Sequence, residues 1–282
     1  SRHLAEPYLE IHPADAERLG LGPAALASVT SPSGRAILRV LISDRVAQGH
    51  PFAPMHWTGN SAPSGRVDAL VSGLADPVSG QPASKSTPVA ITPFTAAWYG
   101  FAISTRDATP DCAYWAKAPV PGGFRLELAG DSAPKDWPAW AAHILGGAPT
   151  AQIADPARGM WRFGRMEAGR VLGALYIAPA PILLARDYLA ELLGSECPTL
   201  LAGRPAADQP DPGPTICACL NIGLNTILGA ISGQRLISVA ALGKAIGAGT
   251  NCGSCRPELA RLLQADKGTG QTERKQGLPI RP

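Results

Sequence analysis

The sequence predicts a multi-domain α+β protein with a β-rich N-terminal part, a small α+β middle domain and a C-terminal all-α module. Three observations support this fold class. Apolar, β-branched runs with turn residues fill residues 1–94, and strand and helix patterns alternate over residues 95–203. After a proline-rich linker at 204–213, residues 214–265 have helical periodicity around paired cysteines, and a polar tail occupies 266–282.

Composition narrows the class of protein. Of the 282 residues 45% are hydrophobic and 17% charged, which is typical of a globular chain. A net charge of +3 is too mild to indicate a nucleic-acid partner. Apolar runs such as residues 171–184 contain Gly and Pro and are too short for a membrane span. With no secretory leader and with paired cysteine motifs, we expect a cytoplasmic protein without membrane or nucleic-acid partners.

The N-terminal part is predicted element by element. We expect a strand at 7–11, a helix at 13–19 that stops at Gly20, a hairpin of strands 27–31 and 37–43, and a strand at 88–93. Pro32-Ser33-Gly34-Arg35 supplies the hairpin turn. The nearly continuous apolar run at 37–42 indicates a strand that is covered on both faces, as in a barrel or sandwich.

Two irregular segments interrupt these strands. Residues 48–59 contain two histidines, an aromatic pair and two prolines, and residues 76–85 are polar and rich in turn formers. Loops on a rigid scaffold are where binding residues concentrate.

The middle domain carries no clear chemical motif. It contains the aromatic run Trp98-Tyr99-Gly100-Phe101 and the run F-R-L-E-L at Phe124. We expect a helix at 137–145, two strands within 158–177 around a turn at 167–170, and a helix at 185–193. Cys112 and Cys197 are isolated, and we interpret both as buried or incidental thiols. A structural spacer is the expected role of this domain.

Four cysteines near the C-terminus form the most specific pattern. Cys217 and Cys219 make a C-x-C, and Cys252 and Cys255 make a C-x-x-C beyond residues 220–251. Four thiolates are a full ligand set for a [2Fe-2S] cluster or for a tetrahedral zinc ion. Structural zinc sites usually have C-x₂₋₄-C on both sides, so the C-x-C arm is unusual for zinc, although it leaves zinc open.

Three helices are expected around these cysteines. One begins after Cys219 and stops at Gly233, a second is capped by Ser238 and ends near Gly247, and a third starts after Cys255 with Pro257 in its first turn. The inward positions of the first helix are Leu220, Leu224, Ile227, Leu228 and Ile231. Both cysteine pairs then lie at helix N-termini, where N–H groups favour anionic sulfur, and Gly249 and Gly253 let backbone amides approach it.

Several stretches resemble known families. T-I-C-A-C-L-N-I-G and A-G-T-N-C-G-S-C-R-P-E-L resemble the bacterioferritin-associated-ferredoxin-like [2Fe-2S] module, which favours iron–sulfur over zinc. Four earlier stretches resemble the C-terminal molybdopterin-dinucleotide-binding domain of molybdenum oxidoreductases, above all the assimilatory nitrate reductases of bacteria. These are E-P-Y-L-E-I-H-P-A-D-A-E-R-L-G-L, V-T-S-P-S-G-R, G-H-P-F-A-P-M-H-W-T-G and D-P-V-S-G-Q-P-A-S-K. Some members of that group end in such a [2Fe-2S] module.

The resemblance implies a fold and a cofactor for residues 1–94. The family's domain is a six-stranded double-psi barrel, and it closes over molybdenum-bis(molybdopterin guanine dinucleotide). On the matching motifs, the residues expected to contact the dinucleotide are His56, Trp57, Thr58, Asp68, Gln81 and Lys85. Such amide, hydroxyl and cationic groups suit pterin edges and phosphate. Trp57 can equally be a core residue, and Asp68 stands where relatives tend to have Asn.

The resemblance also implies a place in an electron path. Electrons from a ferredoxin, a flavodoxin or an NADH-dependent flavoprotein would enter at the [2Fe-2S] cluster and reach a [4Fe-4S] centre and molybdenum, where nitrate becomes nitrite. The [4Fe-4S] cysteine motif and the molybdenum-holding domains of the family do not occur here. We therefore expect a C-terminal portion of a larger enzyme, with no catalytic residue of its own and with the rest of the same polypeptide as partner. The alternatives are a non-enzymatic iron–sulfur or zinc-stabilised interaction module, and a related molybdenum oxidoreductase with another substrate.

Overall fold

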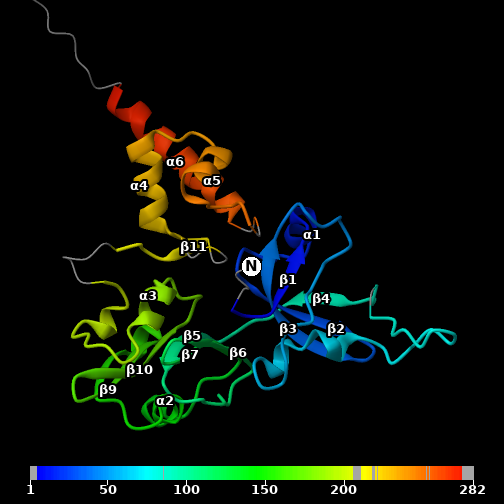
Figure 1. Ribbon diagram of the computed structural model, residues 1–282, viewed down its shortest axis with the longest axis horizontal. Helices are drawn as coiled ribbons and strands as arrows, with labels where there is room; N and C mark the ends of the chain where they lie inside the picture. The colour runs from blue at the N-terminus through cyan, green and yellow to red at the C-terminus, as the bar shows by residue number, and fades with distance from the viewer. Residues whose placement is uncertain are drawn as a thin grey trace, which may run out of the picture. The chain divides into compact units, whose positions relative to one another are not determined.

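The computed structural model describes residues 5–84, 86–205, 211–217, 220, 222–251, 253 and 255–274, with residues 266–274 described by their backbone alone. The chain divides into two compact units (Figure 1). The sheet unit consists of Ala5–Ile182 and Tyr188–Gly203, and the helical unit of Leu183–Asp187 and the residues from Arg204 onward. Each unit has its own buried core.

The first sheet of the sheet unit has four strands in the order β1-β3-β2-β4. They are β1 (Tyr8–Ile11), β3 (Gly34–Ile42), β2 (Leu26–Ser31) and β4 (Ala90–Pro93), with α1 (Pro13–Arg18) after β1. β1 runs parallel to β3, and the other pairs are antiparallel. The predicted hairpin is confirmed, because Ser31 pairs with Gly34 across the expected turn. Most of β3 is buried, as its apolar run predicts.

The six-stranded double-psi barrel expected for residues 1–94 is not confirmed. Among the described residues, the strands of this part form an open sheet in which β1 and β4 are the edges. Residues 44–89 supply two short 3₁₀ turns, η1 (Pro63–Gly65) and η2 (Val67–Leu70), and isolated bridges such as Glu10–Phe52. Six prolines between Pro51 and Pro88 explain this, since proline has no N–H for a ladder.

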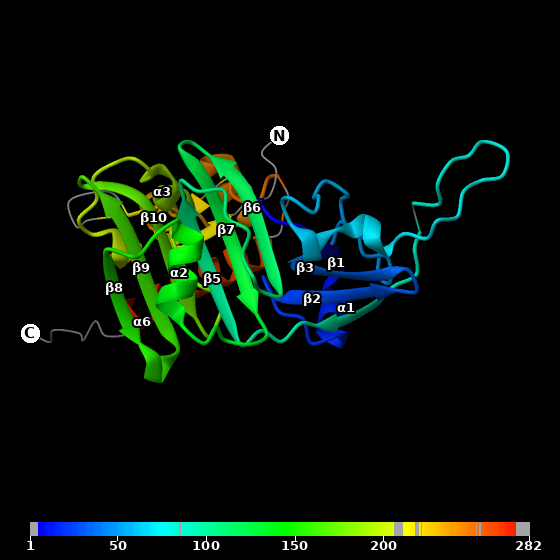
Figure 2. The same cartoon turned by 90° about the horizontal axis from the view of Figure 1, so that it is seen from below.

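The second sheet is antiparallel throughout, in the order β6-β7-β5-β10-β9-β8. Its strands are β5 (Trp98–Ser104), β6 (Tyr114–Val120), β7 (Gly123–Gly130), β8 (Ala151–Asp155), β9 (Met160–Glu167) and β10 (Arg170–Ala178). Helix α2 (Trp137–Leu145) lies across one face of this sheet (Figure 2). The predicted helix at 137–145 is confirmed. It starts at Asp136, whose side chain accepts from the Ala139 amide, and ends at Gly146 in the left-handed region.

An aromatic core joins α2 to the sheet. Trp98 and Trp137 meet edge to face with ring centroids 5.2 Å apart, and Trp161 stacks on Trp137 at 4.9 Å. Such pairs add about 0.5–1.5 kcal/mol each beyond burial. The remaining short elements of the chain before the linker are η3 (Pro156–Arg158), α3 (Arg186–Glu191) and η4 (Leu200–Ala202).

A buried polar group links the two sheets. Oε2 of Glu6 accepts from Nε of Arg39 on β3 at 3.0 Å and from the hydroxyl of Tyr114 on β6 at 2.7 Å. The Arg39 guanidinium also donates to Ala24 O and lies over the Tyr114 ring. Burial, with Glu6 beside it, raises the pKa of Tyr114 well above its usual value. Apolar neighbours complete the junction: Leu26, Ile37, Ala62, Ala116 and Ala129 are all buried in one cluster with Tyr114.

The helical unit combines three helices with a short two-stranded ladder. Its elements are β11 (Thr215–Cys217), β12 (Ile222–Gly223), α4 (Leu224–Gln234), α5 (Val239–Ile246) and α6 (Arg256–Arg274) (Figure 1). Its core contains Cys217, Ile222, Ile227, Ala230, Ile231, Leu242, Ala248, Cys255, Leu259 and Leu263. The second and third helices begin where the sequence predicts, and Ser238 caps α5 by accepting from the Ala241 amide.

Two expectations for this unit need correction. The module is not all-helical, because β11 and β12 pair antiparallel ahead of α4. The first helix was expected directly after Cys219, but it begins at Leu224, since Ile222 and Gly223 are extended and paired. Within α4 the buried face consists of Ile227, Ala230 and Ile231, and Leu228, which was expected to face inward, is exposed.

In the part of the chain that the structure describes, no single helix is long and apolar enough to cross a membrane. Only α4 and α5 taken together pass the length and composition test, and they are bent by 105° at the break between them.

The turn between β9 and β10 gives a first prediction. Ala168 (φ 47°) and Gly169 (φ 77°) both lie in the left-handed region between the paired residues Glu167 and Arg170, as in a two-residue type I′ hairpin. Ala168→Asn is expected to stabilise the chain by about 0.5–1 kcal/mol and Gly169→Ala to destabilise it by about 1 kcal/mol. Urea unfolding followed by tryptophan fluorescence measures both, since all six tryptophans belong to the sheet unit. If both substitutions changed the free energy of unfolding in the same direction, the type I′ turn would be contradicted.

The buried Tyr114 hydroxyl gives a second prediction. Tyr114→Phe removes a hydrogen bond to a carboxylate and is expected to lower the free energy of unfolding by about 1–3 kcal/mol near neutral pH. Because the pKa of Tyr114 is raised in the folded state, its stabilisation is present below about pH 10 and decreases as the pH rises further. The gap between wild type and variant should therefore narrow above about pH 10. Tyr99→Phe is the control, because its hydroxyl makes no hydrogen bond with the described residues, and an equal loss there would contradict the assignment.

Candidate functional site

Two of the four motif cysteines lie in the same buried cluster of the helical unit. Cys217 ends β11 and is 0% exposed, and Cys255 directly precedes α6 and is 4% exposed. Both pack with Ile222, Ile227 and Leu259. Cys219 and Cys252 lie outside the described residues. Folding thus brings a thiol of the C-x-C motif and a thiol of the C-x-x-C motif into one core, although they are 38 positions apart in the sequence.

The loop before α6 is shaped by glycine. Gly249 and Gly253 both have φ of 79°, a conformation that residues with a side chain rarely adopt. A Cβ at Gly249 would lie 3.2 Å from Cγ of Arg256 and 3.2 Å from Cδ1 of Leu259, so the loop packs tightly against α6. Glycine is therefore required at these two positions by the left-handed backbone, and at Gly249 also by the close approach of α6, as the sequence suggested.

The helix termini differ between the two cysteine motifs. Cys255 lies at the N-terminus of α6 as expected, and its carbonyl accepts from the Leu259 amide at 2.9 Å. Cys217 does not lie at a helix N-terminus, because it ends a strand. The first amides of α4 donate instead to proline carbonyls, Leu224 to Pro214 at 2.8 Å and Asn225 to Pro212 at 3.0 Å. Of the two described motif cysteines, Cys255 alone is thus placed to use a helix dipole.

The cysteines that the structure describes fit thiolate ligation. Two thiols of different motifs share a buried core, one of them at a helix N-terminus and beside a glycine loop. Ionised sulfur placed in such a core needs a bound cation, which a metal cluster supplies. Within the described ranges, which leave out Cys219 and Cys252, no group of three or more His, Cys, Asp or Glu side chains is placed to hold a metal ion. The full ligand set therefore stays a prediction.

The two other cysteines have different surroundings. Sγ of Cys112 donates to Tyr114 O at 3.2 Å, and burial raises the pKa of the Cys112 thiol to about 12. Cys197 is buried near Thr199. Both belong to the sheet unit, apart from the paired motifs in the chain.

The expected dinucleotide contacts lie on two loops of the sheet unit. His56 is exposed, whereas Trp57 is half-buried against the junction cluster and meets Tyr8 edge to face at 6.0 Å. Trp57 is therefore partly a core residue, as the sequence allowed, because it packs against buried residues while staying half-exposed. Thr58 begins a turn: its amide donates to Oγ of Ser61 at 3.0 Å, and its carbonyl accepts from the Ala62 amide at 2.8 Å.

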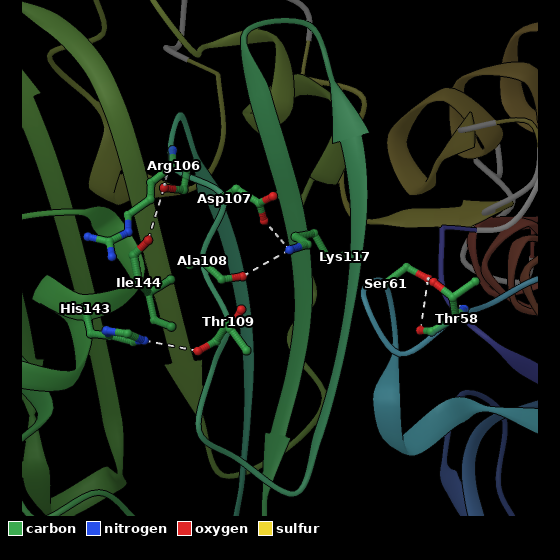
Figure 3. A network of polar contacts seen from close by, with 10 residues as sticks. Thr58, Ser61, Arg106, Asp107, Ala108, Thr109, Lys117, His143 and Ile144 are labelled. Atoms are coloured by element: carbon green, nitrogen blue, oxygen red, sulfur yellow. Dashed lines mark hydrogen bonds and ion pairs between the residues drawn. The ribbon is translucent and has the colours of Figure 1, made fainter. Parts of the chain in front are cut away.

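This turn is fixed to the second sheet. The amide of Lys117 on β6 donates to Ser61 O at 2.7 Å, beside the Thr58–Ser61 contact in Figure 3. The Lys117 ammonium in turn contacts Asp107 and donates to Ala108 O. The exposed His56–Thr58 segment is thus held by a strand of the neighbouring sheet.

Asp68 and Gln81 complete the described set. Asp68 on η2 forms a two-point ion pair with Arg66, with N–O distances of 2.6 and 3.2 Å, and this pairing lowers the pKa of the Asp68 carboxyl. Gln81 is exposed on an arm in which Asp76 caps a turn by accepting from the Val78 and Ser79 amides. Lys85 lies outside the described residues. The hydrogen bonds found for Thr58, Asp68 and Gln81 are with near neighbours in sequence.

The residues that hold the 44–62 loop in place were not predicted from the sequence. Oδ2 of the buried Asp15 accepts from the Gly49 amide at 2.6 Å, which lowers the pKa of Asp15, and the buried Glu10 pairs with Arg45 at 2.9 Å. Two buried carboxylates thus anchor the start of the 44–62 loop. Glu10 gave a signal, since it interrupts the apolar run of the predicted strand at 7–11, whereas Asp15 is one of several charged residues in the predicted helix at 13–19.

Comparison with known proteins gives both ends of the chain a family. Residues 1–88 match the molydopterin dinucleotide binding domain, and residues 215–265 match the BFD-like [2Fe-2S] binding domain. A nitrate reductase of Klebsiella oxytoca is 34% identical over 271 residues, which make up 94% of this chain and 31% of that protein. This chain therefore spans about a third of the length of that relative. Because the likeness covers 94% of the chain, it includes the second sheet, which neither domain match reaches.

These matches agree with the geometry at each end of the molecule. The two described cysteines of the second match share a buried core, and the 44–62 loop of the first match is anchored by buried carboxylates and by β6. The chain joins a segment that matches the molydopterin dinucleotide binding domain to a segment that matches the BFD-like [2Fe-2S] binding domain, and it is similar to a nitrate reductase across both.

Proposed function

We propose that this chain serves a molybdenum oxidoreductase that reduces nitrate to nitrite in nitrate assimilation. Its helical unit would relay electrons through a [2Fe-2S] cluster, and its sheet unit would help to hold molybdopterin guanine dinucleotide. The observation that carries the proposal is the shared burial of Cys217 and Cys255 within a segment that matches a [2Fe-2S]-binding family. The likeness to a nitrate reductase supports nitrate as the substrate.

Each group of residues has a part in this proposal. Cys217, Cys219, Cys252 and Cys255 would supply the four thiolates, and the apolar core around the two described ones would keep water away. His56, Trp57, Thr58, Asp68, Gln81 and Lys85 would contact the dinucleotide. When bound, the cluster supplies one-electron transfer, and molybdenum supplies the two-electron reduction of nitrate.

The sheet-unit loops suit a polar, anionic ligand. The hydroxyl of Thr58 and the side-chain amide of Gln81, both on exposed residues, can donate to phosphate or pair with a pterin edge. Asp68 is kept ionised by Arg66, so it would accept from pterin N–H groups. Because this chain spans 31% of its relative, the proposal assigns molybdenum ligation, nitrate binding and a [4Fe-4S] centre to other parts of the enzyme.

The cluster assignment predicts a selective effect of cysteine variants. Cys217→Ser and Cys255→Ser are expected to abolish the brown colour and the visible absorption that bleaches with dithionite, and to lower iron from about two atoms per chain to near zero. Cys112→Ser is the matched control, because its thiol lies in the other unit and is kept protonated by burial. The measurement is the visible spectrum together with metal analysis.

The outcomes separate the two metals. A colourless wild-type protein with one zinc per chain would overturn the iron–sulfur assignment and favour a zinc-stabilised module. Loss of colour in the Cys112 variant as well would mean that the spectrum reports general stability and not ligation.

The relay role predicts that electron delivery and nitrate chemistry can be separated in the complete enzyme. In the Cys217→Ser enzyme, nitrate reduction driven by a protein donor should fall by more than about 100-fold, because electrons no longer enter at the cluster. Reduced methyl viologen, a small donor that can reach other centres directly, should still support nitrate reduction at a comparable rate. Molybdenum and guanine dinucleotide content are measured alongside as controls for assembly. Equal loss with both donors, at full molybdenum content, would contradict the relay role.

A further inference from the structure

Exposed cations outnumber acids around the cysteine motif of the helical unit. Among residues 211–265 the cations are Arg235, Lys244, Arg256 and Arg261, and the acids are Asp211 and Glu258. All four cations are exposed. Glu258 is already paired with Arg261 at 3.1 Å. Among the residues whose side chains the structure describes, Arg235, Lys244 and Arg256 have no ion-pair partner.

Lys244 and Arg256 lie at the two ends of the loop that carries the C-x-x-C motif. Lys244 is in the last turn of α5, and Arg256 is the first residue of α6. The loop packs back onto both helices: a Cβ at Gly243 would lie 2.8 Å from Cγ2 of Thr250, and one at Gly249 would lie 3.2 Å from Cγ of Arg256. The stem of Arg256 thus covers the loop that contains the second cysteine motif.

The third unpaired cation lies elsewhere. Arg235 caps the C-terminus of α4, ahead of α5, whose eight residues span about 12 Å. It is therefore at the opposite end of α5 from the cysteine loop. The helical unit places two of its exposed cations beside the loop and one away from it.

We propose that Lys244 and Arg256 form a docking face for an acidic electron-donor protein at the cysteine loop. This inference rests on the proposed relay function and names the partner's surface chemistry. The carboxylates of such a donor would pair with the two cations and bring its redox centre close to the loop. One electron then passes from the reduced donor to the oxidised cluster, so the donor is oxidised and the cluster reduced, with no bond made or broken.

Charge complementarity is the physical basis of this partner choice. Opposite charges on two proteins raise the association rate, and the effect decreases with ionic strength. Two cations around one short loop suit a compact acidic patch. A nucleic acid would require a longer basic stripe, and the net charge of +3 over 282 residues offers none.

The test uses an acidic [2Fe-2S] ferredoxin as probe and the cluster-loaded full chain. Stopped-flow absorbance measures the second-order rate at which the reduced ferredoxin reduces the chain. Titration calorimetry with oxidised ferredoxin measures the dissociation constant without any electron transfer. The variants are Lys244→Gln, Arg256→Gln and their combination, and Arg235→Gln is the matched control.

For the double variant we expect a rate about 10-fold lower and a dissociation constant about 10-fold higher at low ionic strength, with the difference nearly gone at 0.5 M salt. Arg235→Gln should change either value by less than about 2-fold. Dithionite should bleach all variants alike, which shows that the cluster is intact in each.

Two outcomes count against the idea in different ways. Unchanged ferredoxin binding and rate in the double variant, with normal bleaching, would overturn the docking face and leave the relay function standing. A wild-type chain that shows no bleaching with dithionite would overturn the relay function and the docking face with it. An equal loss in Arg235→Gln would mean that overall charge, and not this face, attracts the donor.

Discussion

The sheet unit depends on one largely buried cation. Arg39 lies in β3, where residues 36–42 are otherwise apolar, and its side chain is only 14% exposed, so its guanidinium must be neutralised where it is. Glu6 provides the charge, and Tyr114 shares the same carboxylate oxygen from the neighbouring sheet. Tyr114 on the second sheet donates to this carboxylate, and losing a hydrogen bond to a charged group typically costs about 1–3 kcal/mol, so this contact adds a directional link between the sheets to the apolar cluster around it.

That junction also sets the position of the candidate dinucleotide loops. Ser61 accepts from the Lys117 amide on β6, and Ala62 and Trp57 belong to the same cluster as Tyr114. From the other side, Asp15 and Glu10 hold the start of the loop through Gly49 and Arg45. A loop rich in proline cannot be held by a strand ladder, so side-chain and single backbone contacts take over that task. The exposed His56–Thr58 segment is thereby presented from a fixed base.

The sequence allowed prediction of elements whose signals are local. The β2–β3 hairpin, the turn at Ala168–Gly169 and the cap of α5 at Ser238 were predicted from turn or capping residues, and α2 from its helical pattern, and the structure has all four. The open first sheet and the late start of α4 were not, because both depend on pairing between distant or neighbouring extended segments. Ile222 and Gly223 fit a helical pattern by themselves, and only their pairing with β11 makes them extended.

The candidate site likewise has a part that the sequence predicts and a part that only the fold brings together. The four cysteines stand out by spacing, whereas the cations beside them do not, since Lys244 and Arg256 are twelve positions apart and become neighbours of one loop only when α5 and α6 fold against it. Because the core of the helical unit is small, folding of this loop and binding of a metal to its cysteines affect the same free energy. Its glycines are very flexible in the unfolded chain, so ordering them on folding costs conformational entropy. A bound metal would offset that cost, because it binds to and stabilises only the folded form. Cluster binding and the formation of the charged face around it are therefore expected to be coupled in one folding event.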